Sequence, residues 1–179
     1  MKHPAMLILG VIALSAATGH AQQPYAGLQT RAIKSLSEEQ IADLRNGRGM
    51  GLALAAELNG YPGPIHVLEL ADQLSLTQEQ RSRVEGLFKA MKAETIPLGE
   101  KLIRLEADLD HQFASGAATL PNLEQATDAI GMTQGSLRAA HLKYHLLTIT
   151  ELKPAQVQRY KELRGYKDAA PAAPHRGHH

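Results

Sequence analysis

The sequence predicts an all-α protein of four or five helices, with a long antiparallel helical hairpin as its central feature. Apolar residues recur at spacings of three, four and seven along most of the chain, which is the period of an amphipathic helix. Capping sequences and prolines stand where helices are expected to begin. The chain has no cysteine, no tryptophan and two phenylalanines, so packed aliphatic side chains must form its core.

Residues 1–21 are typical of a signal peptide. Lys2 precedes an apolar run over residues 6–17, and small residues stand one and three positions before a cleavage point after Ala21. The run is shorter than the roughly 20 apolar residues that span a bilayer as a helix. We therefore expect cleavage after Ala21, a periplasmic location and no stable membrane span in the mature chain. An uncut anchor is the alternative.

The first helix is expected after a flexible leader at residues 22–35, which show no sustained period. Ser37 opens a Ser-Glu-Glu-Gln sequence with the form of a capping box, in which the serine and glutamine side chains each bond a free backbone N–H. The helix should run from there to about Leu58. Three glycines weaken it and allow a break or a close crossing: Gly47, Gly49 and Gly51.

Residues 59–64 predict a firm corner, because glycine favours a helix stop and two prolines remove N–H donors. A short helix should follow from Pro64. A second capping box at Thr77 then opens the longest periodic stretch, which extends to about Phe113. Pro97 interrupts this stretch, so we expect a kink there and not a reversal of the chain.

The second arm of the hairpin should begin at Pro121, after a turn at residues 114–117. A short connection between two long helices normally makes them antiparallel neighbours. A last helix is expected from Pro154, and the helical domain should span residues 36–166. Residues 167–179 are rich in alanine, proline and histidine and predict a disordered tail.

Two pentapeptides repeat one pattern near helix starts. The first is Leu76-Thr77-Gln78-Glu79-Gln80, and the second is Leu152-Lys153-Pro154-Ala155-Gln156. Both are similar to the Leu-Thr-x-x-Gln element that marks the Spy/CpxP family of bacterial periplasmic proteins. Lys153 replaces the threonine in the second copy and cannot accept the capping bond. Leu36 to Gln40 is a looser third copy, and the resemblance covers roughly residues 64–166. Its motif positions are Leu76, Thr77, Gln80, Leu152 and Gln156.

The resemblance implies a curved helical cradle, often a dimer, that acts without ATP on unfolded or misfolded envelope proteins or in envelope-stress signalling. Relatives in this family include periplasmic metal sensors. The resemblance therefore implies a holding or refolding chaperone or a stress-response accessory protein, with a homodimer as one option. A periplasmic heavy-metal-binding sensor or metal-resistance protein is the alternative. A structural or inhibitory partner of an envelope signalling protein is a third class.

The charge balance argues against a nucleic-acid partner. After cleavage, 18 basic and 18 acidic residues remain, because Lys2 is the one charged residue of the signal segment. The charges are uneven, since residues 138–167 hold seven basic and two acidic residues. This stretch is either a solvated helix face or a surface that attracts acidic partners.

His141 and His145 are the candidate metal ligands. They lie four residues apart on a predicted helix, so their rings share one side, as two ligands of zinc, nickel or copper would. The other reading is a pair of packed or hydrogen-bonded histidines beside the apolar seam. The glutamate that follows the first histidine in a metalloprotease motif is missing, because Leu142 stands there.

No motif for catalysis stands out elsewhere. The serines lie in no nucleophile motif, no phosphate-binding glycine loop of recognised form occurs, and no carboxylate pair is singled out for acid and base roles. We therefore expect a binding protein without enzymatic activity and without a required cofactor.

Overall fold

The structure is a computed structural model that describes residues 25–166. The predicted signal peptide, the first residues of the leader and the predicted tail at 167–179 lie outside this range. Within it the chain is helical and has no strand, which confirms the all-α prediction. None of these helices combines the length and the apolar character that crossing a membrane requires.

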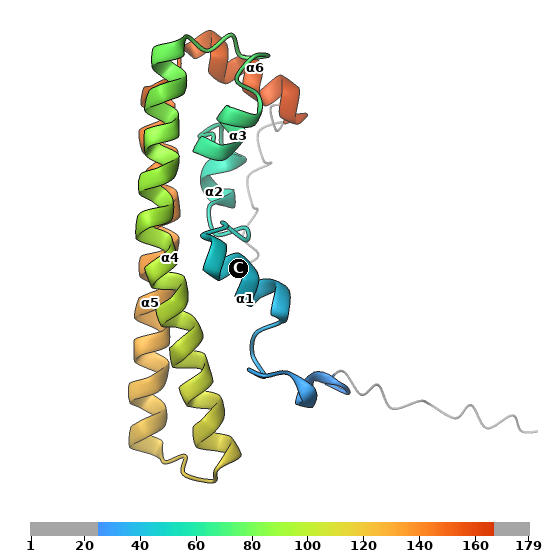
Figure 1. The fold of residues 1–179 in the computed structure, drawn as a ribbon, viewed down its shortest axis with the longest axis vertical. Helices are drawn as coiled ribbons and strands as arrows, with labels where there is room; N and C mark the ends of the chain where they lie inside the picture. Colours follow the sequence, from blue (N-terminus) through green and yellow to red (C-terminus); the bar gives the residue numbers. More distant parts are fainter. Residues whose placement is uncertain (1–24, 167–179) are drawn as a thin grey trace, which may run out of the picture.

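Six α-helices and one short 3-10 helix make up the described chain, where four or five helices were predicted (Figure 1). The predicted first helix is two helices, because the glycine-rich stretch at residues 47–51 separates them. The 3-10 helix is Leu28–Thr30, and the α-helices are α1 Glu38–Asn46, α2 Leu54–Glu57, α3 Pro64–Glu69, α4 Gln78–Ala114, α5 Leu120–Thr150 and α6 Pro154–Arg164.

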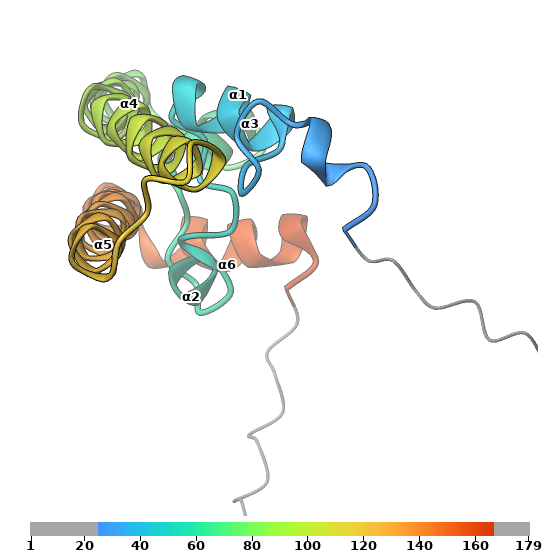
Figure 2. The same ribbon diagram turned by 90° about the horizontal axis from the view of Figure 1, so that it is seen from below.

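α4 and α5 are the two long elements, and they lie side by side and run in opposite directions (Figures 1 and 2). Each starts at a threonine whose side chain accepts a backbone N–H, Thr77 from Gln80 and Thr119 from Asn122. Pro97 lies inside α4, and the helix continues through it. Figure 1 shows the second half of α4 leaning away from the line of the first half.

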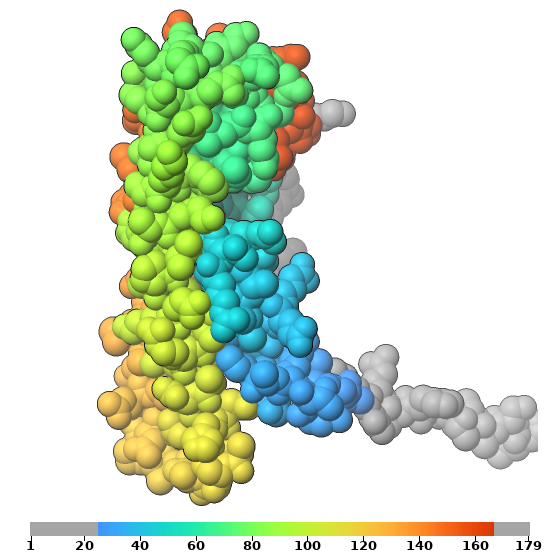
Figure 3. Space-filling view, viewed as in Figure 1, coloured from blue at the N-terminus to red at the C-terminus, as the bar shows by residue number. Residues whose placement is uncertain are grey.

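The shorter helices form a second layer on one side of this pair. Figure 2 shows α1, α2, α3 and α6 on the same side of α4 and α5, and Figure 3 shows the residues from 25 to α1, coloured blue to cyan, against one side of α4. α1 ends at Gly47, which has a left-handed φ of 63°. Packing also favours glycine at this position, because a Cβ on Gly47 would lie 2.8 Å from Thr95 Oγ1.

Two apolar clusters hold the layers together. One joins α1 to the middle of α4 and α5, and the other joins α3 and α6 to the start of α4. Their buried members are Ile33, Leu44, Leu102, Ile103, Ile130 and Leu137 in the first, and Val67, Leu74, Val84 and Tyr160 in the second.

The packed chain begins ahead of residue 36, where the helical domain was expected to start. Ile33 is buried in the first cluster, although it lies within the predicted flexible leader. Lys34 Nζ lies 3.3 Å from Asp110 Oδ2, and Ser35 Oγ donates to Glu106 Oε2 at 2.7 Å. These contacts pair residues more than 70 positions apart, so sequence periodicity gives no sign of them.

Candidate functional site

The structure brings the two Leu-Thr-x-x-Gln elements together. Gln80 Nε2 donates to Gln156 Oε1 at 2.8 Å, and Gln156 Nε2 donates back to Gln80 Oε1 at 3.1 Å. Each amide also reaches a backbone carbonyl, Gln80 that of Glu151 and Gln156 that of Leu74. The same glutamine oxygens accept the N–H of the residue before their own helix.

These contacts make the motif residues a joint between helix ends. Gln80 and Gln156 connect the start of α4, the end of α5 and the start of α6. Leu76 and Leu152 pack against the second apolar cluster. Lys153 takes part in the cap of α6 through its backbone N–H and carbonyl alone, as expected for a residue whose side chain carries no acceptor. The motif residues therefore have a structural role, because the side-chain amides of both glutamines are hydrogen-bonded within the protein.

His141 and His145 lie on the inner side of α5 and face the segment between α1 and α3. His141 is 2 % exposed and stands 3.7 Å from the position that a Cβ would take on Gly49. His145 packs against Gly63 in the same way, and its Nδ1–H donates to the carbonyl of Tyr61 at 2.6 Å. Because Gly49 and Gly63 carry no side chain, the rings of His141 and His145 can lie close to the backbone of this segment.

The environment of His141 favours the neutral ring. Burial first, and then the positive charge of a protonated His145, lower the pKa of His141 below its ordinary value. Its Nε2 is buried and has no hydrogen-bond partner among the described residues. Between residues 25 and 166, no three His, Asp or Glu side chains are grouped closely enough to hold a metal ion.

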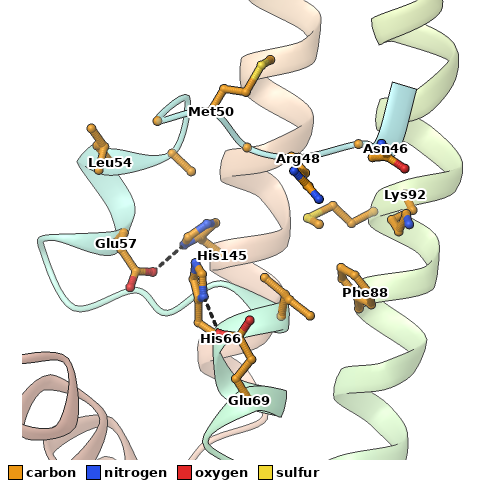
Figure 4. Close-up of a pocket in the computed structure, with 16 residues that line it drawn as sticks. Asn46, Arg48, Met50, Leu54, Glu57, His66, Glu69, Phe88, Lys92 and His145 are labelled. Atoms are coloured by element: carbon orange, nitrogen blue, oxygen red, sulfur yellow. Dashed lines mark hydrogen bonds and ion pairs between the residues drawn. The ribbon is translucent and has the colours of Figure 1, made fainter. Parts of the chain in front are cut away.

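A pocket of about 560 Å³ opens beside His145 (Figure 4). Residues 46–57, α3 and α4 form its walls. The apolar part of the lining is Met50, Leu54, Ile65, Phe88 and Met91. Figure 4 shows Arg48 and Lys92 on one side of the pocket and Glu57, His66 and Glu69 on the other. Sequence periodicity could not indicate this pocket, because four separate segments line it.

Large apolar side chains are exposed beside this pocket. Leu54 is 54 % exposed and Leu58 58 % exposed, and Met50 and Tyr61 are also open to solvent. All four belong to residues 50–61, which comprise the end of the glycine-rich stretch, α2 and the start of the corner before α3. α2 and its flanking residues therefore present several large apolar side chains to solvent.

Glu57 is a buried carboxylate that the sequence did not single out. Its Oε1 accepts from the Tyr160 hydroxyl and, at 2.9 Å, from the Tyr166 hydroxyl, while Oε2 accepts from the N–H of Gly63 at 3.2 Å. Arg164 Nε lies 3.6 Å away. Burial, followed by the hydrogen bond to Glu57, raises the pKa of Tyr160 well above its ordinary value. Glu57 thus joins the wall of the pocket to α6.

Three cations of the basic stretch at residues 138–167 pair within the protein. Lys143 Nζ bonds to Glu94, whose carboxylate also accepts from the Tyr144 hydroxyl at 3.0 Å. The bond from Lys143 holds the pKa of Glu94 below its ordinary value. Arg159 pairs with Glu162, and Arg164 lies near Glu57. These pairs reduce the charge that the stretch offers to a partner.

No family model matches this chain, and no curated protein or solved structure is similar enough to count as a match.

Proposed function

We propose that this protein is an ATP-independent periplasmic chaperone or envelope-stress accessory protein of the Spy/CpxP type, which binds unfolded or misfolded proteins. The observation that carries the proposal is the group of exposed apolar side chains at residues 50–61, beside a pocket with an apolar lining. These four large apolar side chains are exposed within one short stretch of chain, and a concentration of exposed apolar surface is typical of a site that binds other proteins. Met50 suits varied clients, because its unbranched, flexible side chain adapts to different shapes.

The layered arrangement supports a cradle-like binding face. The short helices lie on one side of the α4–α5 pair, so the exposed apolar segment belongs to that side (Figure 2). The Leu-Thr-x-x-Gln elements and the predicted signal peptide support the Spy/CpxP assignment and the periplasmic location. A homodimer that extends the same face is part of this proposal.

The chemistry of the face explains how clients would be held and released without ATP. Apolar contact is non-directional and grows with buried area, so it does not require one client sequence. Weak binding of this kind lets a client dissociate without an energy source. Arg48 and Lys92 beside the apolar group would speed encounter with acidic segments.

The proposal is tested with the mature protein and several unrelated aggregation-prone clients. Equimolar protein should delay client aggregation, measured by light scattering, and the Leu54→Gln, Leu58→Gln double variant should delay it less. The matched control is Leu120→Gln, Met132→Gln, because these side chains are more exposed than Leu54 and Leu58 but lie far along α5 from the pocket. No delay with any client, or equal loss in both double variants, would contradict the proposal.

Metal binding is the second candidate function, and the unpartnered Nε2 of buried His141 beside His145 favours it. Calorimetry of the mature protein with zinc, nickel and copper tests it. Tight uptake should disappear in the His141→Ala, His145→Ala double variant. Uptake that is unchanged in that variant would rule out this pair as the site.

A further inference from the structure

The pocket between residues 46–57, α3 and α4 has the features of a small-molecule site. Its volume of about 560 Å³ lies within the range of roughly 300–1,000 Å³ that is usual for such sites. Phe88, Met91 and Ile65 line it from two different helices, so an apolar body would be covered on more than one side. The few charged groups stand around this apolar surface (Figure 4).

Of the two carboxylates in the pocket lining, Glu57 is fully engaged and Glu69 is engaged through one oxygen. Glu57 accepts three hydrogen bonds from within the protein, from Gly63, Tyr160 and Tyr166. Glu69 Oε2 lies 3.0 Å from His66 Nδ1 on the same short helix. Glu57 therefore offers a ligand little, whereas the Glu69 side chain is 54 % exposed and lies on the other side of the pocket from Arg48 and Lys92 (Figure 4).

The two cations of the pocket lining stand apart from its two carboxylates (Figure 4). Lys92 forms no ion pair within residues 25–166, and its Nζ lies 5.8 Å from the centre of the Phe88 ring. Arg48 uses one guanidinium nitrogen for Asp43, at 2.9 Å, and its side chain is 68 % exposed, so other N–H groups remain free. Both cations stand on the same side of the pocket (Figure 4).

We propose that this pocket binds a small, free monocarboxylate with an apolar body. The carboxylate accepts hydrogen bonds from Lys92 and Arg48, and the apolar body lies against Phe88, Met91 and Ile65. An amine in the same place would meet two cations, and an uncharged alcohol would gain only the apolar contacts. This inference goes beyond chaperone activity and does not depend on it.

Octanoate is the probe, titrated into the mature protein by isothermal titration calorimetry below its micelle concentration. We expect saturable binding of octanoate, weaker binding of octanol and the weakest binding of octylammonium. Lys92→Gln should weaken octanoate binding by about fivefold, the size typical of a partly exposed ion pair, and leave octanol unchanged. Lys89→Gln is the matched control, because Lys89 is exposed on α4 one turn earlier and does not line the pocket.

A variant of the apolar wall separates the contribution of the apolar contacts from that of the carboxylate contact. Phe88→Ala should weaken octanoate and octanol alike. The proposal is overturned if octanoate does not saturate, if octylammonium binds as well as octanoate, or if Lys92→Gln and Lys89→Gln bind octanoate equally. A protein that delays client aggregation but does not bind octanoate overturns this inference alone, and the reverse result overturns chaperone activity alone.

Discussion

At the scale of single residues, His141 is a buried polar side chain with an unsatisfied nitrogen. Its ring is buried between α5 and the glycine-containing segment after α1, and its Nε2 has no partner in the described chain. A buried polar atom without a partner costs about 1–3 kcal/mol. The fold therefore gains little from the imidazole itself, and an apolar side chain of similar size should be tolerated there.

His141→Leu should change the free energy of unfolding at pH 7.5 by less than about 1 kcal/mol, because it replaces an unsatisfied polar group with an apolar one. Urea denaturation at pH 7.5 measures this change. A loss of several kcal/mol would show that the ring makes a contact that the present structure lacks.

The same variant should flatten the pH dependence of stability. The pKa of His141 is lowered in the folded state, while the unfolded chain takes up a proton near its ordinary pKa of about 6.5. The unfolded state therefore binds more protons as pH falls through 6.5, and the folded protein loses stability from there down to the folded pKa. Urea denaturation at pH 7.5 and 5.5 should show a smaller loss in His141→Leu than in the wild type. Equal losses would contradict the burial of a neutral ring.

At the scale of elements, α4 contains two glycines with opposite surroundings. A Cβ on Gly99 would lie 2.5 Å from the backbone oxygen of Leu44, whereas a Cβ on Gly86 would meet nothing within 4 Å. Gly99 is therefore where α1 crosses α4, and Gly86 is an ordinary helix position. The apolar pattern of α4 does not distinguish them.

Gly99→Ala should lower the free energy of unfolding by about 1–3 kcal/mol, since the backbone of α1 would have to move. Gly86→Ala in the same helix should raise it by up to about 1 kcal/mol through helix propensity. Chemical denaturation of both variants measures the difference. Stabilisation by both substitutions would show that α1 does not cross α4 this closely.

The paired glutamines predict coupling between α4 and α6. Gln80→Ala and Gln156→Ala should each cost about 1–3 kcal/mol, because each leaves buried partners unsatisfied. The double variant should cost less than the sum by about 1 kcal/mol, since the two amides bond each other. Additive losses in urea denaturation would mean that the two motifs act separately.

At the scale of the whole molecule, Glu57 joins α2 to the corner before α3 and to the C-terminal part of the described chain. It bonds to Tyr160 and Tyr166, which lie more than 100 residues later, and to the backbone before α3. His145 Nδ1 lies 3.8 Å from it on α5. The buried carboxylate of Glu57 therefore links the wall of the pocket to α6.

Glu57→Gln should lower the free energy of unfolding by about 1–3 kcal/mol and speed hydrogen exchange in α6, because the amide replaces an acceptor with a donor. Glu69→Gln is the control, since Glu69 is exposed and should change stability by less than about 0.5 kcal/mol. Unchanged exchange in α6 would contradict the role of Glu57 in fastening this helix.

The local features of the fold could be predicted from the order of residues. Periodicity indicated the long helices, and capping boxes at Ser37 and Thr77 marked helix starts that the structure confirms. Pro154 likewise begins α6. Each of these signals acts between residues at most a few positions apart, so the chain carries it before any tertiary packing forms.

The candidate site could not be predicted in the same way. The pairing of Gln80 with Gln156 and the bond of Glu57 to Tyr160 of α6 both join segments more than 70 residues apart. Such contacts depend on how the helices pack and which faces meet. Periodicity names an apolar face but not its partner, so the pocket exists only after α1, α3, α4 and α5 have packed together.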